Sequence, residues 1–212
     1  MSDAIDRRSR KRLETRRNIS YAATGLFAEK GFDNVTIDEI ASAADVGRMT
    51  VFNHFPRKED MFFDRDEEIR ETLADALRQR KDADSPIESL RLLAHRLIAE
   101  QRSFLQFSEG SLGFIATIKG SETLKARARA IRDEVANGIA AELAHGAGRD
   151  ETDIDANLAA ALLLACWSVA LVSAHEQYQQ TRDANRAAAL FLAIVDKGAA
   201  GQKAALAGTP YA

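Results

Sequence analysis

A short segment in the first third of the chain carries side chains whose types match the edges of DNA bases. Arg48 has the forked donors that pair with guanine, Asn53 has the amide that pairs with adenine, and Met49 is apolar enough to contact a thymine methyl group. Thr50 and His54 add polar groups within the same seven residues. The segment is therefore a candidate for reading base edges.

The flanking residues predict a helix–turn–helix that positions these side chains. Thr36 and Glu39 have the spacing of a capping box, which starts a short helix running to about Ala44. Residues 45–47 interrupt it, and a second helix ends at Phe55 because a proline follows. Such a pair presents its second helix to the major groove. The apolar residues expected to hold that helix down are Val46, Val51 and Phe55. The alternative is an ordinary two-helix corner whose polar residues face water.

Positive charge is concentrated at the start of the chain. The 212 residues carry 29 Lys and Arg against 32 Asp and Glu, a formal net charge of −3, which argues against a uniformly basic protein. The first helix, in contrast, is expected to begin with a basic run that contacts the phosphate backbone. Its members are Arg7, Arg8, Arg10, Lys11, Arg12, Arg16 and Arg17.

Helical periodicity dominates the sequence, which predicts an all-α fold of about nine helices. Helices are expected over residues 8–30, 36–44, 48–55, 58–79, 85–108, 121–145, 152–179 and 183–198, with an irregular apolar piece at 112–118. The uncharged stretch 158–174 is interpreted as a buried packing helix rather than a membrane span. The single cysteine, Cys166, and the charged N-terminus favour a cytoplasmic protein without an internal disulfide.

Residues 16–63, RRNISYAATGLFAEKGFDNVTIDEIASAADVGRMTVFNHFPRKEDMFF, resemble the DNA-binding region of TetR-family transcriptional regulators. The resemblance implies that Thr36 and Lys58 contact phosphates. The implied DNA-binding residues are Arg16, Arg17, Thr36, Gly47, Arg48, Met49, Thr50, Phe52, Asn53, His54 and Lys58. The sequence departs from the family pattern with Phe52 for tyrosine, Gly47 for serine, Asp45 for glycine and Arg57 for serine. The first removes a phenolic phosphate contact, and the second weakens a helix cap.

The resemblance divides the chain into a DNA-binding domain, residues 1–57, and a helical effector-binding and dimerisation domain, residues 58–212. One recognition helix reads too few base pairs for a genomic site, so a two-fold dimer is expected. The candidate dimer residues are Leu158, Ala161, Leu162, Ala165, Val169, Val172, Leu190, Phe191 and Ile194; internal packing is their alternative role. The candidate ligand-binding residues are His95, Arg96, Gln101, Phe104, Phe107, Phe114 and Trp167.

The remaining chemistry-bearing residues predict no metal site, cofactor or enzymatic activity. The four histidines lack metal-ligand spacing, and neither a phosphate-binding glycine loop nor a nucleophile elbow occurs. The expected function is a homodimeric repressor that a small-molecule effector releases from an inverted-repeat operator in double-stranded DNA. Two alternatives stay open: a non-specific DNA-coating protein, and a helical small-molecule-binding protein with a vestigial DNA-binding head.

Overall fold

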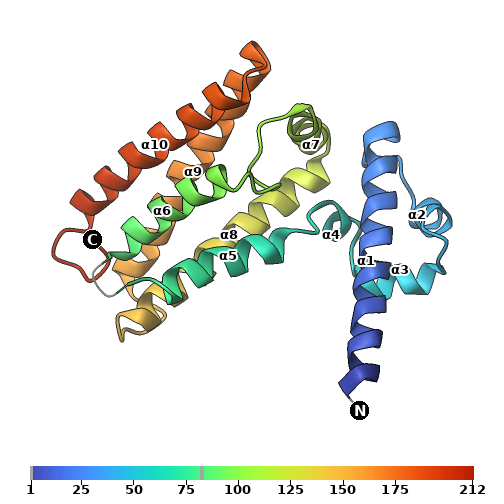
Figure 1. Ribbon diagram of the computed structural model, residues 1–212, viewed down its shortest axis with the longest axis horizontal. Helices are drawn as coiled ribbons and strands as arrows, with labels where there is room; N and C mark the ends of the chain where they lie inside the picture. Colours follow the sequence, from blue (N-terminus) through green and yellow to red (C-terminus); the bar gives the residue numbers. More distant parts are fainter. Residues whose placement is uncertain (1, 82–83) are drawn as a thin grey trace. The chain divides into compact units, whose positions relative to one another are not determined.

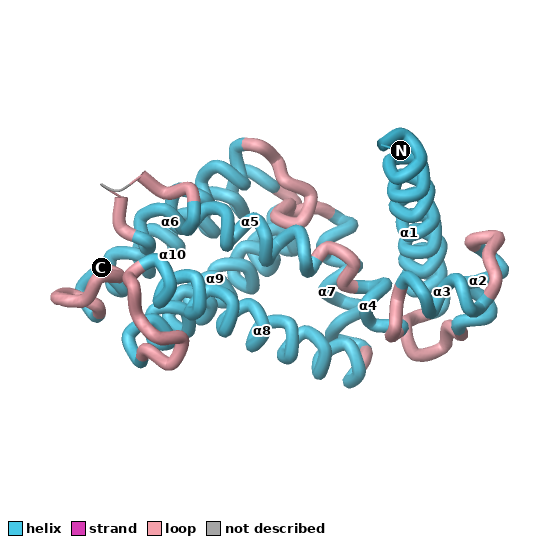
Figure 2. Tube along the Cα trace, turned by 90° about the horizontal axis from the view of Figure 1, so that it is seen from below, coloured by secondary structure: helices cyan, strands magenta, loops and turns pink. Residues whose placement is uncertain are grey.

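The computed structural model describes residues 2–81 and 84–212, and every regular element within those ranges is a helix (Figures 1 and 2). The expected all-α class is confirmed, with ten helices in the described part of the chain rather than about nine. They are α1 (Ser2–Lys30), α2 (Ile37–Ala43), α3 (Arg48–His54), α4 (Lys58–Phe62), α5 (Asp66–Arg78), α6 (Pro86–Ala99), α7 (Glu109–Gly120), α8 (Glu122–Gly146), α9 (Ile154–Thr181) and α10 (Ala184–Ala205).

Two compact units make up the described chain. The N-terminal unit contains the residues up to Asp64 together with Gly113–Ala128, and the C-terminal unit contains Arg65–Leu112 and Arg129–Ala212. Residues 58–64 and 113–128 therefore pack with the predicted helix–turn–helix, although the sequence-based division placed them in the second domain. The functional division at residue 57 stays a prediction.

The N-terminal unit is built on an aromatic cluster that α1, α4 and α7 share. Phe62 stacks on Phe114 with the ring centroids 4.5 Å apart, and Phe27 and Phe32 pack beside it. Two polar contacts hold the later segment in place: Ser121 Oγ donates to Asp33 at 2.9 Å, and Arg127 lies 3.4 Å from Asp60. The remaining core residues include Ile19, Ile40, Val51, Phe55, Met61 and Leu124.

The C-terminal unit has α9 and α10 as its most extensively packed pair. A short turn at Arg182, with φ of 54°, joins them, and their axes approach closely where Gly198 lies against Cys166. Phe191, Leu93 and Tyr211 are almost completely buried in the same core. By length and composition alone α9 is also long enough to cross a membrane, a property that core helices of soluble proteins share.

Several helix boundaries differ from the sequence predictions. The helix expected over 58–79 divides at Phe63–Arg65, where Asp64 accepts a hydrogen bond from Ser20 of α1. The helix expected to reach residue 108 ends at Ala99, because Gln101 adopts a left-handed conformation with φ of 51°.

Two further predicted boundaries were also wrong. The piece at 112–118 belongs to α7, a regular helix that contains three glycines, so glycine content alone did not break it. The last helix continues beyond Gly198 to Ala205, because that glycine packs against α9 instead of ending α10.

Candidate nucleic-acid interface

The capping box predicted for α2 is present. The Glu39 amide donates to Thr36 Oγ1 at 3.2 Å, and the Thr36 amide donates to Glu39 Oε2 at 2.8 Å. Lys30, at the end of α1, approaches the same carboxylate at 2.7 Å. Hydrogen bonds from Lys30 and Thr36 lower the pKa of Glu39 to about 2. The end of α1 and the start of α2 are therefore joined through one ionised side chain.

The turn between α2 and α3 has the conformation that its residues favour. Asp45 lies in the left-handed region with φ of 51°, one that aspartate tolerates better than most residues. The Val46 amide donates back to the Ala41 carbonyl at 3.0 Å and closes the end of α2. Gly47 is the N-cap of α3 and makes no side-chain cap, as expected from the absence of a hydroxyl group.

The inner face of α3 is buried, and its outer face is open. Val51 and the adjoining Phe55 are completely buried in the core of the N-terminal unit. Met49 is 70% exposed, and Arg48 and Asn53 are also exposed. The remaining predicted contact residues of this helix are Phe52, at 36% exposure, and the half-buried Thr50 and His54. The structure therefore gathers the predicted base-reading side chains on one accessible surface.

Arg48 has one intramolecular ion pair on this surface. Its Nη1 lies 3.1 Å from Asp38 of α2, and its guanidinium is 5.7 Å from the ring centroid of Phe52. The Arg48 and Asp38 side chains are 58% and 68% exposed, so solvent weakens the pair. Its disruption would expose the guanidinium at little cost.

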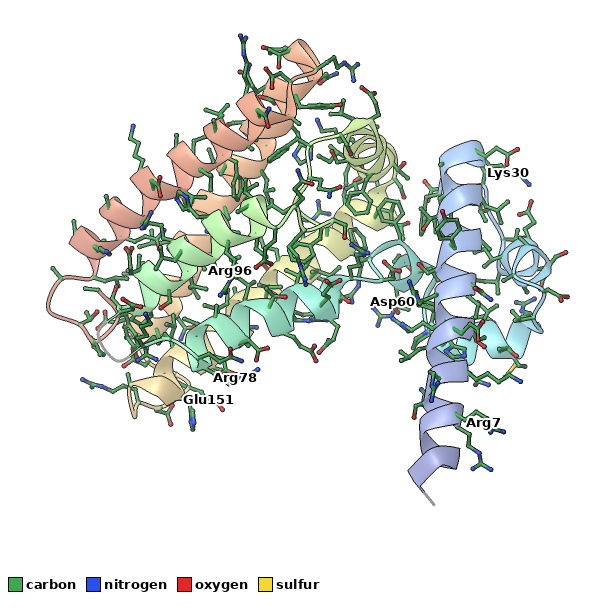
Figure 3. The ribbon with its side chains drawn as sticks, viewed as in Figure 1. Arg7, Lys30, Asp60, Arg78, Arg96 and Glu151 are labelled. Carbon is green, nitrogen blue, oxygen red and sulfur yellow. The ribbon has the colours of Figure 1, made fainter. Side chains whose placement is uncertain are left out.

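The basic residues of α1 differ in their surroundings. Arg16 stacks over Phe55 at 4.0 Å and donates to the carbonyl of His54, so it holds α3 against α1. Burial, followed by the charges of Arg12 and Arg16, lowers the pKa of His54. Arg17 is exposed. The exposed cations on the first half of the helix are Arg7, Arg8, Arg10, Lys11 and Arg12, and Figure 3 shows Arg7 pointing away from the helix axis.

The two predicted phosphate-contacting side chains are engaged within the protein. Lys58 Nζ donates to the carbonyls of Phe32 and Val35 at 2.9 Å each, and the Thr36 hydroxyl lies within the capping box. The Lys58 bonds fix α4 to the loop between α1 and α2. Phosphate contacts by these groups stay a prediction, since an ammonium group with three donors has one left.

The candidate ligand-binding residues are divided between the two units, and their role stays a prediction. Phe107 and Trp167 both pack against Phe191, but Phe114 lies in the N-terminal unit. His95 Nε2 is 2.8 Å from Asp196. The other candidates are the exposed Arg96 and Gln101, and the half-buried Phe104 beside Arg102.

A groove between α5 and α8 in the C-terminal unit was not predicted from the sequence. It has a volume of about 330 Å³ and an apolar floor that includes Leu73, Val135 and Ile139. The apolar residues that line the groove alternate with charged residues along both helices, and any amphipathic helix has the same pattern. The groove can be recognised only in the tertiary structure, where the two helices lie side by side.

The candidate dimer residues divide between the surface and the core. Leu158, Val169 and Val172 are 43%, 57% and 55% exposed. Ala161 and Ala165 are exposed with them, and Leu162, Leu190 and Ile194 are half-buried. Phe191 is completely buried and forms part of the core, so it is not accessible to a second chain. Ile154, 81% exposed on the same side of α9, was not predicted because it lies before the uncharged stretch.

The potential metal ligands of the protein are dispersed. Among the side chains of residues 7–81 and 84–212, no group of three or more His, Cys, Asp or Glu residues is arranged to hold a metal ion. The lone thiol of Cys166 is half-buried, and burial raises its pKa.

Comparisons with known proteins identify the N-terminal segment. The sequence model described as "Bacterial regulatory proteins, tetR family" matches residues 19–64. The HTH-type transcriptional regulator TcmR of Streptomyces glaucescens is 31% identical over 83 residues, which cover 39% of this chain and 37% of that protein. The matched region thus spans little more than a third of this curated relative.

Solved structures extend the similarity to most of the chain. NalD, the secondary repressor of a multidrug efflux pump in Pseudomonas aeruginosa, superposes with a TM-score of 0.56 at 21% identity over 87% of this chain and 96% of NalD. The TetR-family repressor FadR of Thermus thermophilus, solved with lauroyl-CoA, gives 0.51 at 25% identity over 86% and 94%. Residues 19–64 therefore match the sequence model of the TetR family of bacterial regulatory proteins, and the chain shares its fold with solved TetR-family regulators.

Proposed function

We propose that this chain is a homodimeric repressor that binds an inverted-repeat operator and leaves it when a small-molecule effector binds the C-terminal unit. The observation that carries the proposal is the division of α3, whose inner residue Val51 is completely buried and whose outer residues Arg48, Met49 and Asn53 are exposed. An ordinary two-helix corner requires the buried side of α3 for packing, but it does not require these particular side chains on the exposed side. An uncovered row of a guanidinium, a thioether and an amide matches what base edges in a major groove accept.

The other residues of this surface have backbone roles in the proposal. Arg17 and Thr50 are proposed to contact the DNA backbone beside the base-reading residues, and Gly47 adds no side chain at the start of α3 that would obstruct the DNA. Phe52 is proposed to contact the DNA backbone through its ring alone, because it has no hydroxyl group. The exposed cations of α1 add sequence-independent attraction to the backbone.

Dimerisation is proposed to occur through α9 and α10. Five α9 residues recur at helical spacing on the outside of the unit: Leu158, Ala161, Ala165, Val169 and Val172. Such an apolar stripe on a surface helix favours a partner helix, and its alanines allow close approach. Two protomers would present two α3 helices to half-sites one turn of the duplex apart, about 34 Å.

The oligomeric state is testable by sedimentation. We expect Val169→Arg to convert a dimer into a monomer, and Glu151→Gln, a change at an exposed loop residue, to leave the dimer intact. A chain that sediments as a monomer at every concentration contradicts the proposed dimer.

Effector control requires unequal binding to the operator-bound and free conformations, typically worth about 1–3 kcal/mol. The polypeptide connection between the units is short, because α4 is followed by α5 after only Phe63–Arg65. A change in the direction of α5 would therefore be transmitted directly to α4, which Lys58 fixes to the loop before α2.

The decisive experiment selects bound sequences from random duplex DNA with the full chain. We expect enrichment of an inverted repeat, with Arg48→Ala and Asn53→Ala each weakening binding by about 1–3 kcal/mol and relaxing selection at one position per half-site. The matched controls Arg149→Ala and Asn185→Ala change exposed residues of the other unit and should have no effect.

Two results would contradict operator recognition. Selection without any enriched sequence would indicate a DNA-coating protein, and equal binding by the α3 variants and their controls would indicate a vestigial head.

A further inference from the structure

Two ion pairs cross the groove between α5 and α8. Arg70 of α5 lies 2.6 Å from Glu134 of α8, and Arg78 lies 2.8 Å from Glu142. The paired residues are eight positions apart on each helix, so the two ion pairs are separated by about 12 Å along the helix axes. Each ion pair therefore joins the two helices near one end of the groove.

Between the two bridges the groove has an apolar floor and an empty centre. Leu73, Val135 and Ile139 lie at the floor with exposed fractions of 5%, 7% and 3%. Gly138 lines the groove, and a Cβ atom built on it would meet no atom within 4 Å. The volume of about 330 Å³ lies in the range of small-molecule sites.

The charges around the groove are predominantly negative. Arg70 is shared among Asp66, Glu67 and Glu134, and Arg78 between Asp75 and Glu142. Both guanidinium groups are therefore neutralised by surrounding carboxylates.

Glu71 adds a further carboxylate to this rim. It lines the groove, is exposed, and has no ion pair or hydrogen bond with any described residue. An apolar floor beneath a rim with this excess of carboxylates is complementary to a positively charged molecule with an apolar body.

We infer that the α5/α8 groove is the effector site and that it binds a lipophilic organic cation. This deepens the proposed function by naming the class of effector. Both walls of the groove are continuous in sequence with the N-terminal unit: α5 follows it directly after Asp64, and α8 starts within it and leaves it at Ala128. A ligand that separates the walls therefore acts on two of the chain segments that join the units.

The test is calorimetric titration of the full chain, without DNA, with tetraphenylphosphonium and with the nearly isosteric anion tetraphenylborate. We expect the cation to bind once per chain and at least ten-fold more tightly than the anion. Glu71→Gln should weaken cation binding about five-fold, as expected for one exposed charge, and Glu151→Gln should have no effect. Gly138→Leu should weaken it at least ten-fold by filling the groove, whereas Gly25→Leu, at another open helical glycine, should not.

Several results would overturn the assignment: no binding of the cation, equal or tighter binding of the anion, or unchanged binding by Gly138→Leu. Glu71→Gln is a surface change that leaves the core intact, so it tests the charge argument even if the leucine variant fails to fold. Because no DNA is present, failure here leaves operator binding untouched. A failed operator selection likewise leaves the cation result standing.

Discussion

The contact between α9 and α10 makes Gly198 the residue whose substitution tests the packing most directly. A Cβ atom at this position would lie 2.0 Å from Cys166 Sγ and 3.0 Å from Cys166 Cβ. The first distance requires the sulfur to move, and the second leaves little room for it to do so. Gly198→Ala should therefore force the two helices apart.

The expected magnitude follows from two opposing effects. Overpacking a core contact costs about 1–3 kcal/mol, and the severity of this overlap places it near the upper end. Replacing glycine by alanine within a helix gains about 1 kcal/mol. We expect a net loss of about 2 kcal/mol in the free energy of unfolding. Gly138→Ala, where the new Cβ meets nothing within 4 Å, should instead raise it by about 0.5–1 kcal/mol.

Urea unfolding followed by the fluorescence of Trp167, the single tryptophan and the neighbour of Cys166, measures these changes. All variants must be compared at one chain concentration, because dimerisation would contribute to stability. Adding Cys166→Ala to Gly198→Ala should recover about 1 kcal/mol, since it removes the overlapping sulfur. The packing argument is refuted if Gly198→Ala stabilises as much as Gly138→Ala, or if the two substitutions at the contact are additive.

Two further predictions concern the N-terminal unit. Because the pKa of Glu39 is lowered from 4.5 to about 2, its ionised form stabilises the folded state above pH 4.5, and this contribution is lost as the pH falls towards 2. The protection factors of the α2 amides against hydrogen exchange, that is, the intrinsic rates divided by the observed rates, should therefore fall more steeply over this pH range in the wild type than in Glu39→Gln; parallel profiles would show that the capping box has no such role. Replacing the exposed α1 cations Arg7, Arg8, Arg10, Lys11 and Arg12 with glutamine should reduce the slope of log K against log salt for DNA binding by about 0.9 for each phosphate that the helix no longer neutralises, and an unchanged slope would exclude the helix from the interface.

Local hydrogen bonding explains why the starts of α2 and α10 were predictable. Thr36 and Glu39 satisfy each other's amides within three residues, and Asp183 likewise accepts from the first amides of α10. The left-handed stop at Gly31, with φ of 78°, depends equally on one residue. Such patterns need no knowledge of distant segments, so their spacing in the sequence is sufficient.

Contacts between distant segments decided the rest. The break between α4 and α5 accompanies a hydrogen bond from Ser20 to Asp64, 44 residues away, and the ring of Phe114 in α7 stacks on that of Phe62 in α4. Neither follows from periodicity, because an amphipathic helix has the same pattern whichever element covers it.

The all-α class, the helix–turn–helix and the apolar side of α3 could be predicted from the sequence, since they depend on spacing within a few residues. The tertiary structure alone decided that Phe191 is buried in the core, that Lys58 is bonded to two carbonyls, and that α5 and α8 enclose a groove. The physical reason is that burial and hydrogen-bond partners depend on which helices meet, and residues that are far apart in the chain determine those meetings.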